Sequence, residues 1–272
     1  MIAAIATLGG MAFILAVGLG IASRIFAVET DPKITTITGL LPGANCGGCG
    51  YAGCSGFATA LVAGEAAPLE CKASGADAIQ EISKVLGVVY VPKEKTIARV
   101  FCQGSLDKAK VRYRYQGIED CNAAMLLGGG AKACVYGCLG MGSCVKACPF
   151  GAISMGPEGL PRIDESSCTG CGACARKCPK GVIELIPARQ MWYISCNSHH
   201  KGKAVRQVCE VGCIACGLCV RNCPEQAITL DNNRAVIDPE KCSGCGICAE
   251  KCPQKVIHSR SEDREVVALS KG

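Results

Sequence analysis

The sequence predicts an α+β protein with a single N-terminal transmembrane helix, a small cysteine-rich domain and two tandem copies of a second cysteine-rich unit. Three observations predict it: an apolar N-terminal stretch, 24 cysteines among 272 residues, and cysteine runs that recur at a fixed interval. The expected regions are the anchor 1–28, the small domain 29–96, the first unit with an N-terminal extension 97–186, an insertion 187–208 and the second unit 209–272.

The apolar stretch covers Ile2–Ala22. No Lys or Arg precedes it and no convincing cleavage site of small residues ends it, so we expect it to be retained. As a helix it would span roughly 32 Å, close to the apolar thickness of a bilayer. Arg24 and Lys33 follow, which predicts a single-pass protein of the cytoplasmic (inner) membrane with its C-terminal body in the cytoplasm. An uncleaved signal and a buried core helix are the alternatives.

The first cysteine module is expected to follow a short linker. Pro32 and Pro42 favour a non-helical linker over 29–42. Beyond it we expect a helix after Cys54 and another over Ala76–Leu86, and the letters LGVVYV at 86–91 favour a closing strand.

A tandem duplication accounts for most of the remaining chain. The Cys-Pro pairs begin at 148, 178, 223 and 252, so the first recurs after 75 residues and the second after 74. Each copy has two apolar segments between its cysteine runs, AISM and PRID in the first and AITL and AVID in the second, which predict a hairpin. The letters MWYISC in the insertion predict one further strand.

Three cysteine runs have the spacing C-x2-C-x2-C-x3-C-P, which is typical of proteins that bind two [4Fe-4S] clusters. Three cysteines of such a run bind one cluster, and the fourth binds the cluster of the facing run. A structural zinc ribbon would separate two C-x2-C pairs and needs no fourth cysteine before a proline. The runs are therefore expected to form two-cluster (8Fe-8S) ferredoxin-like domains, with these members: Cys168, Cys171, Cys174 and Cys178; Cys213, Cys216, Cys219 and Cys223; Cys242, Cys245, Cys248 and Cys252.

The rule that the fourth cysteine of each run binds the cluster of the facing run assigns the cysteines to clusters. The run that faces Cys168 is irregular, because Met141 stands where its second ligand belongs, and Cys134 is the expected replacement. The small domain supplies a fifth set. The five expected sets are Cys213, Cys216, Cys219 and Cys252; Cys242, Cys245, Cys248 and Cys223; Cys168, Cys171, Cys174 and Cys148; Cys134, Cys138, Cys144 and Cys178; and Cys46, Cys49, Cys54 and Cys71.

Four cysteines remain outside these sets: Cys102, Cys121, Cys196 and Cys209. A sixth cluster held by them is a hypothesis that rests on this count alone. The alternative is that they are free cysteines packed in the interior, where free cysteine is common.

Charge and motifs limit the other partners. The formal charge is +6 with only 4% aromatic residues, which argues against a nucleic-acid partner. Basic runs containing Arg99, Lys108, Lys110, Arg112 and Arg114 and then Lys201, Lys203 and Arg206 are either a solvated face or a docking surface for an acidic electron carrier. No Gly-rich nucleotide motif occurs in context, so neither flavin nor NAD is expected on this chain.

The apolar N-terminus, the module LPGANCGGCGYAGC…C and the tandem cysteine runs, in that order, resemble the B subunit of the Rnf complex in its longer form. The resemblance covers essentially the whole chain, and the first module is its most discriminating part. It implies an ion-translocating ferredoxin:NAD oxidoreductase in which this subunit accepts electrons from reduced ferredoxin and passes them to other membrane subunits, with export of Na⁺ or H⁺. It also implies that the 20 assigned cysteines are cluster ligands.

Other functions are compatible with the cysteine spacing. The chain could be a polyferredoxin that supplies electrons to a hydrogenase or another reductase. A corrinoid-linked catalytic protein lacks support because no large α/β barrel is present, and a cluster-based sensor would need one labile site instead of five or six. In each redox reading the chain alone only transfers electrons.

Overall fold

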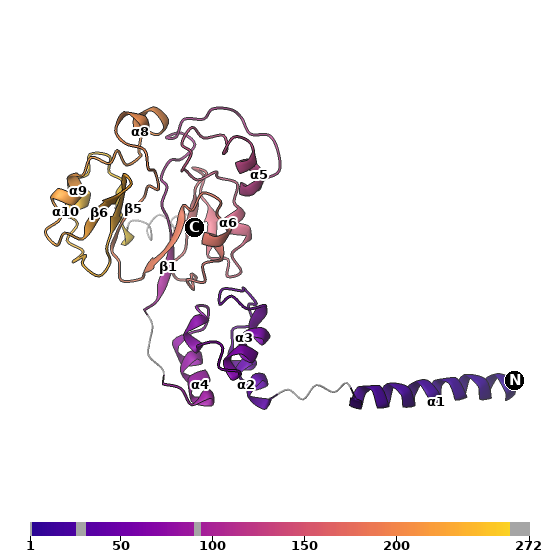
Figure 1. The fold of residues 1–272 in the computed structure, drawn as a ribbon. Coiled ribbons are helices and arrows are strands. Elements are labelled where there is room, and N and C mark those ends of the chain that lie inside the picture. Colours follow the sequence, from indigo (N-terminus) through magenta and orange to yellow (C-terminus); the bar gives the residue numbers. More distant parts are fainter. Residues whose placement is uncertain (1, 26–30, 90–93, 262–272) are drawn as a thin grey trace.

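The computed structural model describes residues 2–25, 31–89 and 94–261 (Figure 1). Helix α1, Ile2–Ile25, extends away from the rest of the molecule. Its large apolar side chains are exposed where they are described, as Phe13 at 72% and Leu19 at 71% illustrate. Within the described ranges, no helix combines the length and the apolar character that crossing a membrane requires.

The small N-terminal module packs three helices together: α2, Pro32–Leu40; α3, Gly53–Val62; and α4, Ala76–Leu86. A short 3-10 helix, η1, covers Pro68–Glu70. The expectation of a non-helical linker was wrong over α2. Pro32 lies in the first turn of α2, where a backbone N–H has no acceptor within the helix, so the missing N–H of proline costs nothing. The Asp31 side chain accepts a hydrogen bond from the Lys33 amide at 2.8 Å and caps the helix. Ile37, Phe57 and Ile82 form the centre of this module.

The end of α4 corrects a second expectation. The helix has the expected bounds, Ala76–Leu86, but the strand expected at 86–91 is absent from its described part, 86–89. Gly87 caps the helix with a left-handed φ of 71°, a conformation that glycine adopts without strain. Val89 then lies 91% exposed, and residues 90 and 91 lie outside the described residues.

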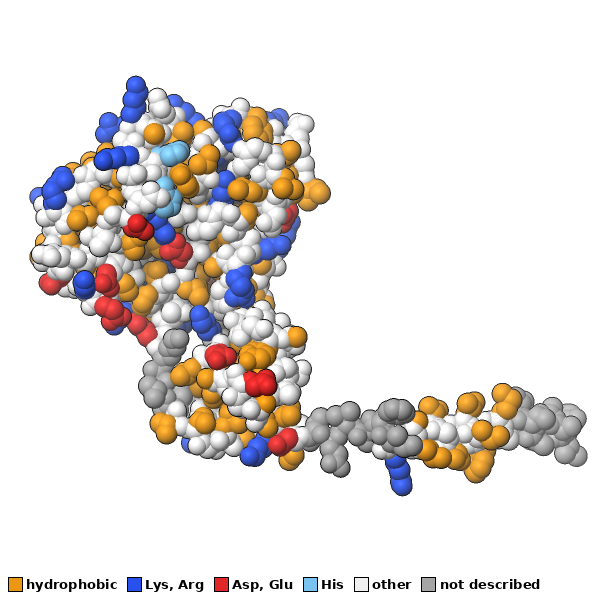
Figure 2. All heavy atoms as spheres, viewed as in Figure 1, with side chains coloured by type: hydrophobic (Ala, Val, Ile, Leu, Met, Phe, Trp, Pro, Cys, Tyr) orange, Lys and Arg blue, Asp and Glu red, His pale blue; other side chains and the backbone are white. Residues whose placement is uncertain are grey.

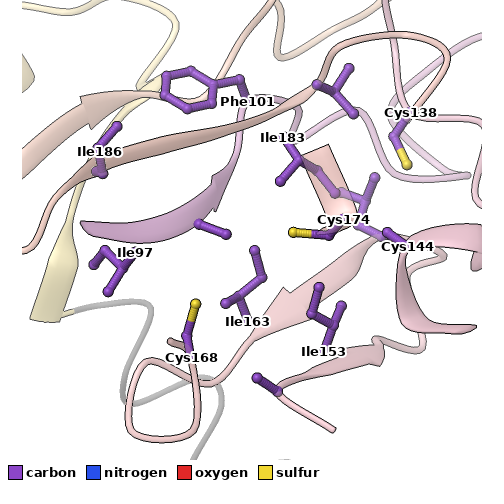
Figure 3. Packing of buried hydrophobic residues seen from close by; sticks show 14 of the residues in the cluster. Ile97, Phe101, Cys138, Cys144, Ile153, Ile163, Cys168, Cys174, Ile183 and Ile186 are labelled. Atoms are coloured by element: carbon purple, nitrogen blue, oxygen red, sulfur yellow. The ribbon is translucent and has the colours of Figure 1, made fainter. Parts of the chain in front are cut away.

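The first copy consists of two antiparallel strand pairs around one core. Strand β1, Thr96–Val100, pairs with β4, Ile183–Pro187, and strand β2, Ile153–Met155, pairs with β3, Pro161–Ile163. Three short helices carry cysteines or follow them: α5, Cys121–Leu126; α6, Ser143–Lys146; and α7, Ala173–Lys177. Figure 3 shows how the cysteines of the core lie among its isoleucines, in a cluster that includes Cys138, Cys144, Cys168, Cys174, Ile153, Ile163 and Ile183.

The second copy repeats this plan. Strand β5, Trp192–Ile194, pairs with β8, Ile257–Ser259, and β6, Ile228–Asp231, forms a hairpin with β7, Arg234–Ile237. The helices are α8, Lys203–Val208; α9, Leu218–Arg221; and α10, Ile247–Glu250. Both expected hairpins and the strand in MWYISC are therefore confirmed. Strand β5, expected within an insertion, takes the place in the second copy that β1 takes in the first.

A buried ion-pair network joins the two copies. Arg99 on β1 is 2% exposed and pairs with Glu165, which also accepts a hydrogen bond from Arg260 at 2.6 Å. The guanidinium of Arg99 lies 5.6 Å from the ring centroid of Tyr193 on β5. Arg99 is thus an interior residue of the interface between the copies, and its expected place in a basic surface run was wrong.

Candidate metal centres

The four cysteine runs of the duplicated region share one local conformation. In each, a glycine with left-handed φ immediately precedes a short helix that carries the third cysteine of the regular spacing. These glycines are Gly142, Gly172, Gly217 and Gly246, with φ of 70°, 75°, 72° and 78°. A side chain would strain this turn. The run that contains Met141 therefore folds like the three regular runs.

The small N-terminal module gathers its four cysteines around one cavity. Cys46, Cys49, Cys54 and Cys71 line it together, as the sequence analysis expected of a ligand set. The Asn45 side-chain oxygen accepts a hydrogen bond from the Cys54 amide at 2.8 Å and fixes the start of α3. Cys171 of the first copy lines the same cavity, and a Cβ atom at Gly48 would lie 3.1 Å from the Cys171 carbonyl oxygen.

The second copy brings its cysteines together across the two runs. One cavity is lined by Cys213, Cys216, Cys219 and Cys252, the grouping that crossing of the fourth cysteine predicts. The other set meets around Cys248: burial raises the pKa of its thiol to about 11, and the charges of neighbouring cysteines contribute to that rise. Those neighbours are Cys242, Cys245 and Cys223.

The first copy places the cysteines of its regular run in the core. Burial, and then the charges of Cys168 and Cys171, raise the pKa of Cys174 to about 12. Cys148, the expected crossed ligand, packs against the same core.

The irregular run has a different fourth partner from the one expected. One cavity is lined by Cys121, Cys138, Cys144 and Cys178, so Cys121 takes the place in which the sequence analysis put Cys134. Met141 packs against a small cluster that contains Cys121. The regular spacing thus loses its second cysteine, and a cysteine from helix α5 fills the gap.

Two side chains hold Cys121 in this position. The Ser143 hydroxyl accepts a hydrogen bond from the Cys121 amide at 2.7 Å and donates one to the Asp120 carboxylate at 2.8 Å. The hydrogen bond from Ser143 holds the pKa of Asp120 below its usual range. Asp120 also accepts from the amides of Asn122 and Ala123, which caps α5. Because Ser143 adjoins Cys144, the cap of α5 is tied directly to the irregular run.

Cys134 lies instead in a cavity between the two copies. Its other cysteines are Cys102, Cys196 and Cys209, three of the four that the sequence analysis left over. This cavity has a volume of about 20 Å³. The cavities lined by the sets of Cys213, Cys138 and Cys46 have the same volume of about 20 Å³. The four cavities are therefore alike in size and each offers a set of four thiols.

The donor chemistry of these cavities fits iron–sulfur clusters. All 24 cysteines lie in the described ranges and are free thiols. Burial raises the pKa of Cys138 and of Cys196 to about 12, and a bound metal ion would favour the thiolate form of both side chains. Among the described residues, no group of three or more His, Cys, Asp and Glu side chains has the geometry to hold a single metal ion.

Two family models match the chain. A family described as a putative Fe-S cluster matches residues 41–73, and a 4Fe-4S dicluster domain matches residues 133–182 and 212–256. These ranges contain the four cysteines of the small module and all four runs of the duplicated region. Iron–sulfur clusters of the four-iron type are thus the cofactor of this fold.

Similar proteins cover most of the chain. The B subunit of the Na(+)-translocating ferredoxin:NAD(+) oxidoreductase complex of Acetobacterium woodii is 42% identical over 86% of this chain and 71% of its own length. The B subunit of an ion-translocating oxidoreductase complex of Methanosarcina acetivorans is 44% identical over 89% and 92%. The B subunit of the proton-translocating ferredoxin:NAD(+) oxidoreductase complex of Clostridium ljungdahlii is 45% identical over 89% and 85%.

Proposed function

This chain belongs to the family of B subunits of ion-translocating oxidoreductase complexes, and we propose that it carries electrons from reduced ferredoxin to the other subunits of such a complex. Those subunits would reduce NAD and translocate Na⁺ or H⁺. The observation that carries the proposal is the presence of four cavities, each of which is lined by the four cysteines of one set.

We assign five [4Fe-4S] clusters to the cysteine sets of the small module and the two copies. When bound, the clusters supply one-electron chemistry over a range of about −700 to +450 mV. Cys121 replaces Cys134 in the set expected from sequence. The ligand sets are Cys46, Cys49, Cys54 and Cys71; Cys148, Cys168, Cys171 and Cys174; Cys121, Cys138, Cys144 and Cys178; Cys213, Cys216, Cys219 and Cys252; and Cys223, Cys242, Cys245 and Cys248.

The chain's own groups position the ligands and adjust the charge that a cluster can carry. The Ala227 amide donates a hydrogen bond to Cys223 Sγ at 3.3 Å, and the Ser74 hydroxyl donates one to Cys71 Sγ at 3.1 Å. Hydrogen bonds to ligand sulfur stabilise the more negative, reduced form and raise the reduction potential. The close approach of Gly48 to Cys171 brings the cluster cavity of the small module next to a ligand cysteine of the first copy.

A basic surface offers a docking site for an acidic electron carrier. We define it as Lys108, Lys110 and Arg114 of the first copy together with Lys201, Lys203 and Arg206 around α8, all of them exposed. The two segments meet through a bridge between Ala109 and Cys209 and a hydrogen bond from the Lys110 amide to the Val208 carbonyl at 3.0 Å. Figure 2 shows Lys and Arg side chains gathered over α8.

This basic surface lies next to a candidate electron entry point. Cys209, which forms the bridge with Ala109, also lines the cavity between the copies. Asp107 and Glu210 lie in the same segments, so the positive charge is partly offset. A ferredoxin docked there would deliver electrons close to the interface of the two copies. Arg112 is not included, because its guanidinium donates hydrogen bonds to the carbonyls of Gly128 and Gly130.

We also propose that residues 2–22 anchor the chain in the inner membrane, with the remaining residues in the cytoplasm. The apolar sequence of residues 2–22 and the exposed apolar side chains of α1 support this proposal. The regions 1–28, 29–96 and 97–272 would then be the anchor, the small cluster domain and the duplicated body. Fractionation tests it: the full chain should stay in membranes washed with carbonate, and a chain lacking residues 1–28 should be released.

Reduction by ferredoxin tests the main proposal. Anaerobically purified chain is mixed with reduced ferredoxin, and cluster reduction is followed by rapid-freeze EPR. We expect reduction on a catalytic timescale, slowed about tenfold at low salt when Lys108, Lys110, Lys203 and Arg206 are changed to Gln.

The matched control changes Lys84, Lys241, Lys251 and Lys255 to Gln, since these four lysines are exposed and are not part of the basic surface. This control should leave the rate unchanged. Absence of reduction in the unaltered chain would remove the ferredoxin-acceptor role. An equal loss of rate in both sets of variants would remove the basic surface as the docking site.

A further inference from the structure

We propose that Cys102, Cys134, Cys196 and Cys209 hold a sixth [4Fe-4S] cluster at the interface of the two copies, and that electrons pass between the copies through it. The relay part of this inference rests on the proposed function. The site itself rests on the residues that line the cavity between the copies.

The four cysteines come in two pairs that the duplication relates. Cys102 follows the last residue of β1 by two positions, and Cys196 follows the last residue of β5 by two. Cys134 precedes the first cysteine of its run, Cys138, by four positions. In the second copy Cys209 precedes Cys213 by the same interval. Each copy therefore contributes one cysteine from the end of an outer strand and one from the approach to a cysteine run.

The hydrogen bonds repeat the same relation. The Cys138 amide donates to Cys102 Sγ at 3.3 Å, and the Cys213 amide donates to Cys196 Sγ at 3.3 Å. Cys102 and Cys196 also face each other in an antiparallel bridge between the copies. Equivalent cysteines thus meet across a local pseudo-twofold axis, with the cavity between them. Unrelated buried cysteines would have no reason to repeat both the spacing and the hydrogen bonds.

A buried cation indicates that the cavity takes an anionic group. Lys132 lines it, is 4% exposed and donates a hydrogen bond from Nζ to the Gly104 carbonyl at 2.6 Å. Within the described ranges Lys132 forms no ion pair with a carboxylate. A buried ammonium group without an opposite charge is strongly unfavourable. A four-iron cluster with four thiolate ligands carries net negative charge and would supply the missing partner.

The site connects the clusters on either side. Cys138, which donates to Cys102 Sγ, belongs to a ligand set of the first copy, and Cys213, which donates to Cys196 Sγ, belongs to a set of the second. One electron from reduced ferredoxin would enter at this interface and leave through either neighbouring set, with no bond made or broken. The two copies would then form one continuous path.

Iron and acid-labile sulfide counts of alanine variants of the full chain test the site. Each of Cys102→Ala, Cys134→Ala, Cys196→Ala and Cys209→Ala should lose about four of about 24 iron atoms. The double variant Cys102→Ala/Cys196→Ala should still lose only about four, because both residues bind the same cluster. In contrast, Cys121→Ala/Cys134→Ala should lose about eight. Full iron in the single variants, or about eight lost in the first double variant, would overturn the proposal.

If an alanine variant loses more than one cluster, its iron count is repeated with serine at the same position, because serine has nearly the same side-chain volume as cysteine. A second measurement leaves all the cysteines intact. Lys132→Met should keep all the iron and shift one midpoint potential to a more negative value, since a positive charge next to the cluster is lost. The exposed Lys84→Met on α4, with the same change in charge, should leave every potential unchanged. Equal potentials in the two variants would contradict a cluster beside Lys132.

Failure of the site and failure of the proposed function give different results. A chain with about 20 iron atoms that ferredoxin still reduces would lack the sixth cluster but keep its function. A chain with about 24 iron atoms that ferredoxin does not reduce would keep the site and lose the proposed donor.

Discussion

The two copies of the duplicated unit form similar cysteine-lined cavities, but they draw the cysteines from different segments of the chain. In the second copy the three local cysteines of a regular run are completed by Cys252. In the first copy Met141 interrupts the run, and Cys121 enters from helix α5. The stretch between the paired cysteines explains how: 31 residues separate Cys102 from Cys134, but only 12 separate Cys196 from Cys209. The longer stretch carries α5, so a ligand position can move to a distant segment while the run keeps its backbone conformation.

Removal of Cys121 is the sharpest way to break this comparison. Cys121→Ala should lose about four iron atoms, because its cavity then has only three thiols. Adding Met141→Cys restores the regular spacing of the second copy and should restore the iron. Iron and sulfide analysis of the anaerobically prepared variants measures both effects. Full iron in Cys121→Ala would show that this cysteine is no ligand.

The next largest effect concerns two glutamates that the repeat relates, Glu165 and Glu240, 75 residues apart. Glu165 is buried and pairs with Arg99 and Arg260, whereas Glu240 is 74% exposed and pairs with Arg189. Glu165→Gln removes the buried carboxylate that pairs with Arg99 and Arg260 and should cost about 3–5 kcal/mol. Glu240→Gln should cost about 0–1 kcal/mol.

Guanidinium denaturation followed by the visible absorbance of the clusters measures this difference in the holoprotein. Equal midpoints for the two variants would mean that the interface of the copies does not depend on the Arg99 ion pair.

A smaller effect is expected at Ser143, whose counterpart 75 residues later is Leu218. Ser143 is 2% exposed, and its hydroxyl accepts a hydrogen bond from the Cys121 amide, a contact that the second copy does not need. Ser143→Ala leaves that amide without a partner and should cost about 1–3 kcal/mol. The variant should release iron to a chelator faster than the unaltered chain. Ser154→Ala, at an exposed serine of β2, is the control and should release iron at the unaltered rate.

Local patterns were sufficient to predict the elements whose determinants lie close together in the chain. The hairpin β6–β7 follows from two apolar segments around Asn232 and Asn233, which take the positive φ values of 44° and 63° that a tight turn requires. Helix α4 and the cavity of the small module likewise follow from neighbouring residues.

Non-local contacts explain what sequence reasoning missed. Strand β1 pairs with β4, so that Thr96 faces Pro187. No periodicity in either segment predicts that these two strands pair. Cys134 lies only four residues before Cys138 and was therefore assigned to its set, but it faces the second copy. Cys121 belongs to no motif. The repeated interval from Cys134 to Cys138 and from Cys209 to Cys213 was the available signal, and it pairs Cys134 with the leftover cysteines.

The most direct test of this account is the iron and sulfide content of the unaltered chain, combined with Mössbauer spectroscopy to establish the cluster type. The two copies with a shared cluster between them, plus the small module, require six four-iron clusters. We therefore predict about 24 iron and 24 sulfide atoms per anaerobically purified chain, all in the four-iron form. A reproducible value near 20 would contradict the shared cluster and leave Cys102, Cys134, Cys196 and Cys209 as packed thiols.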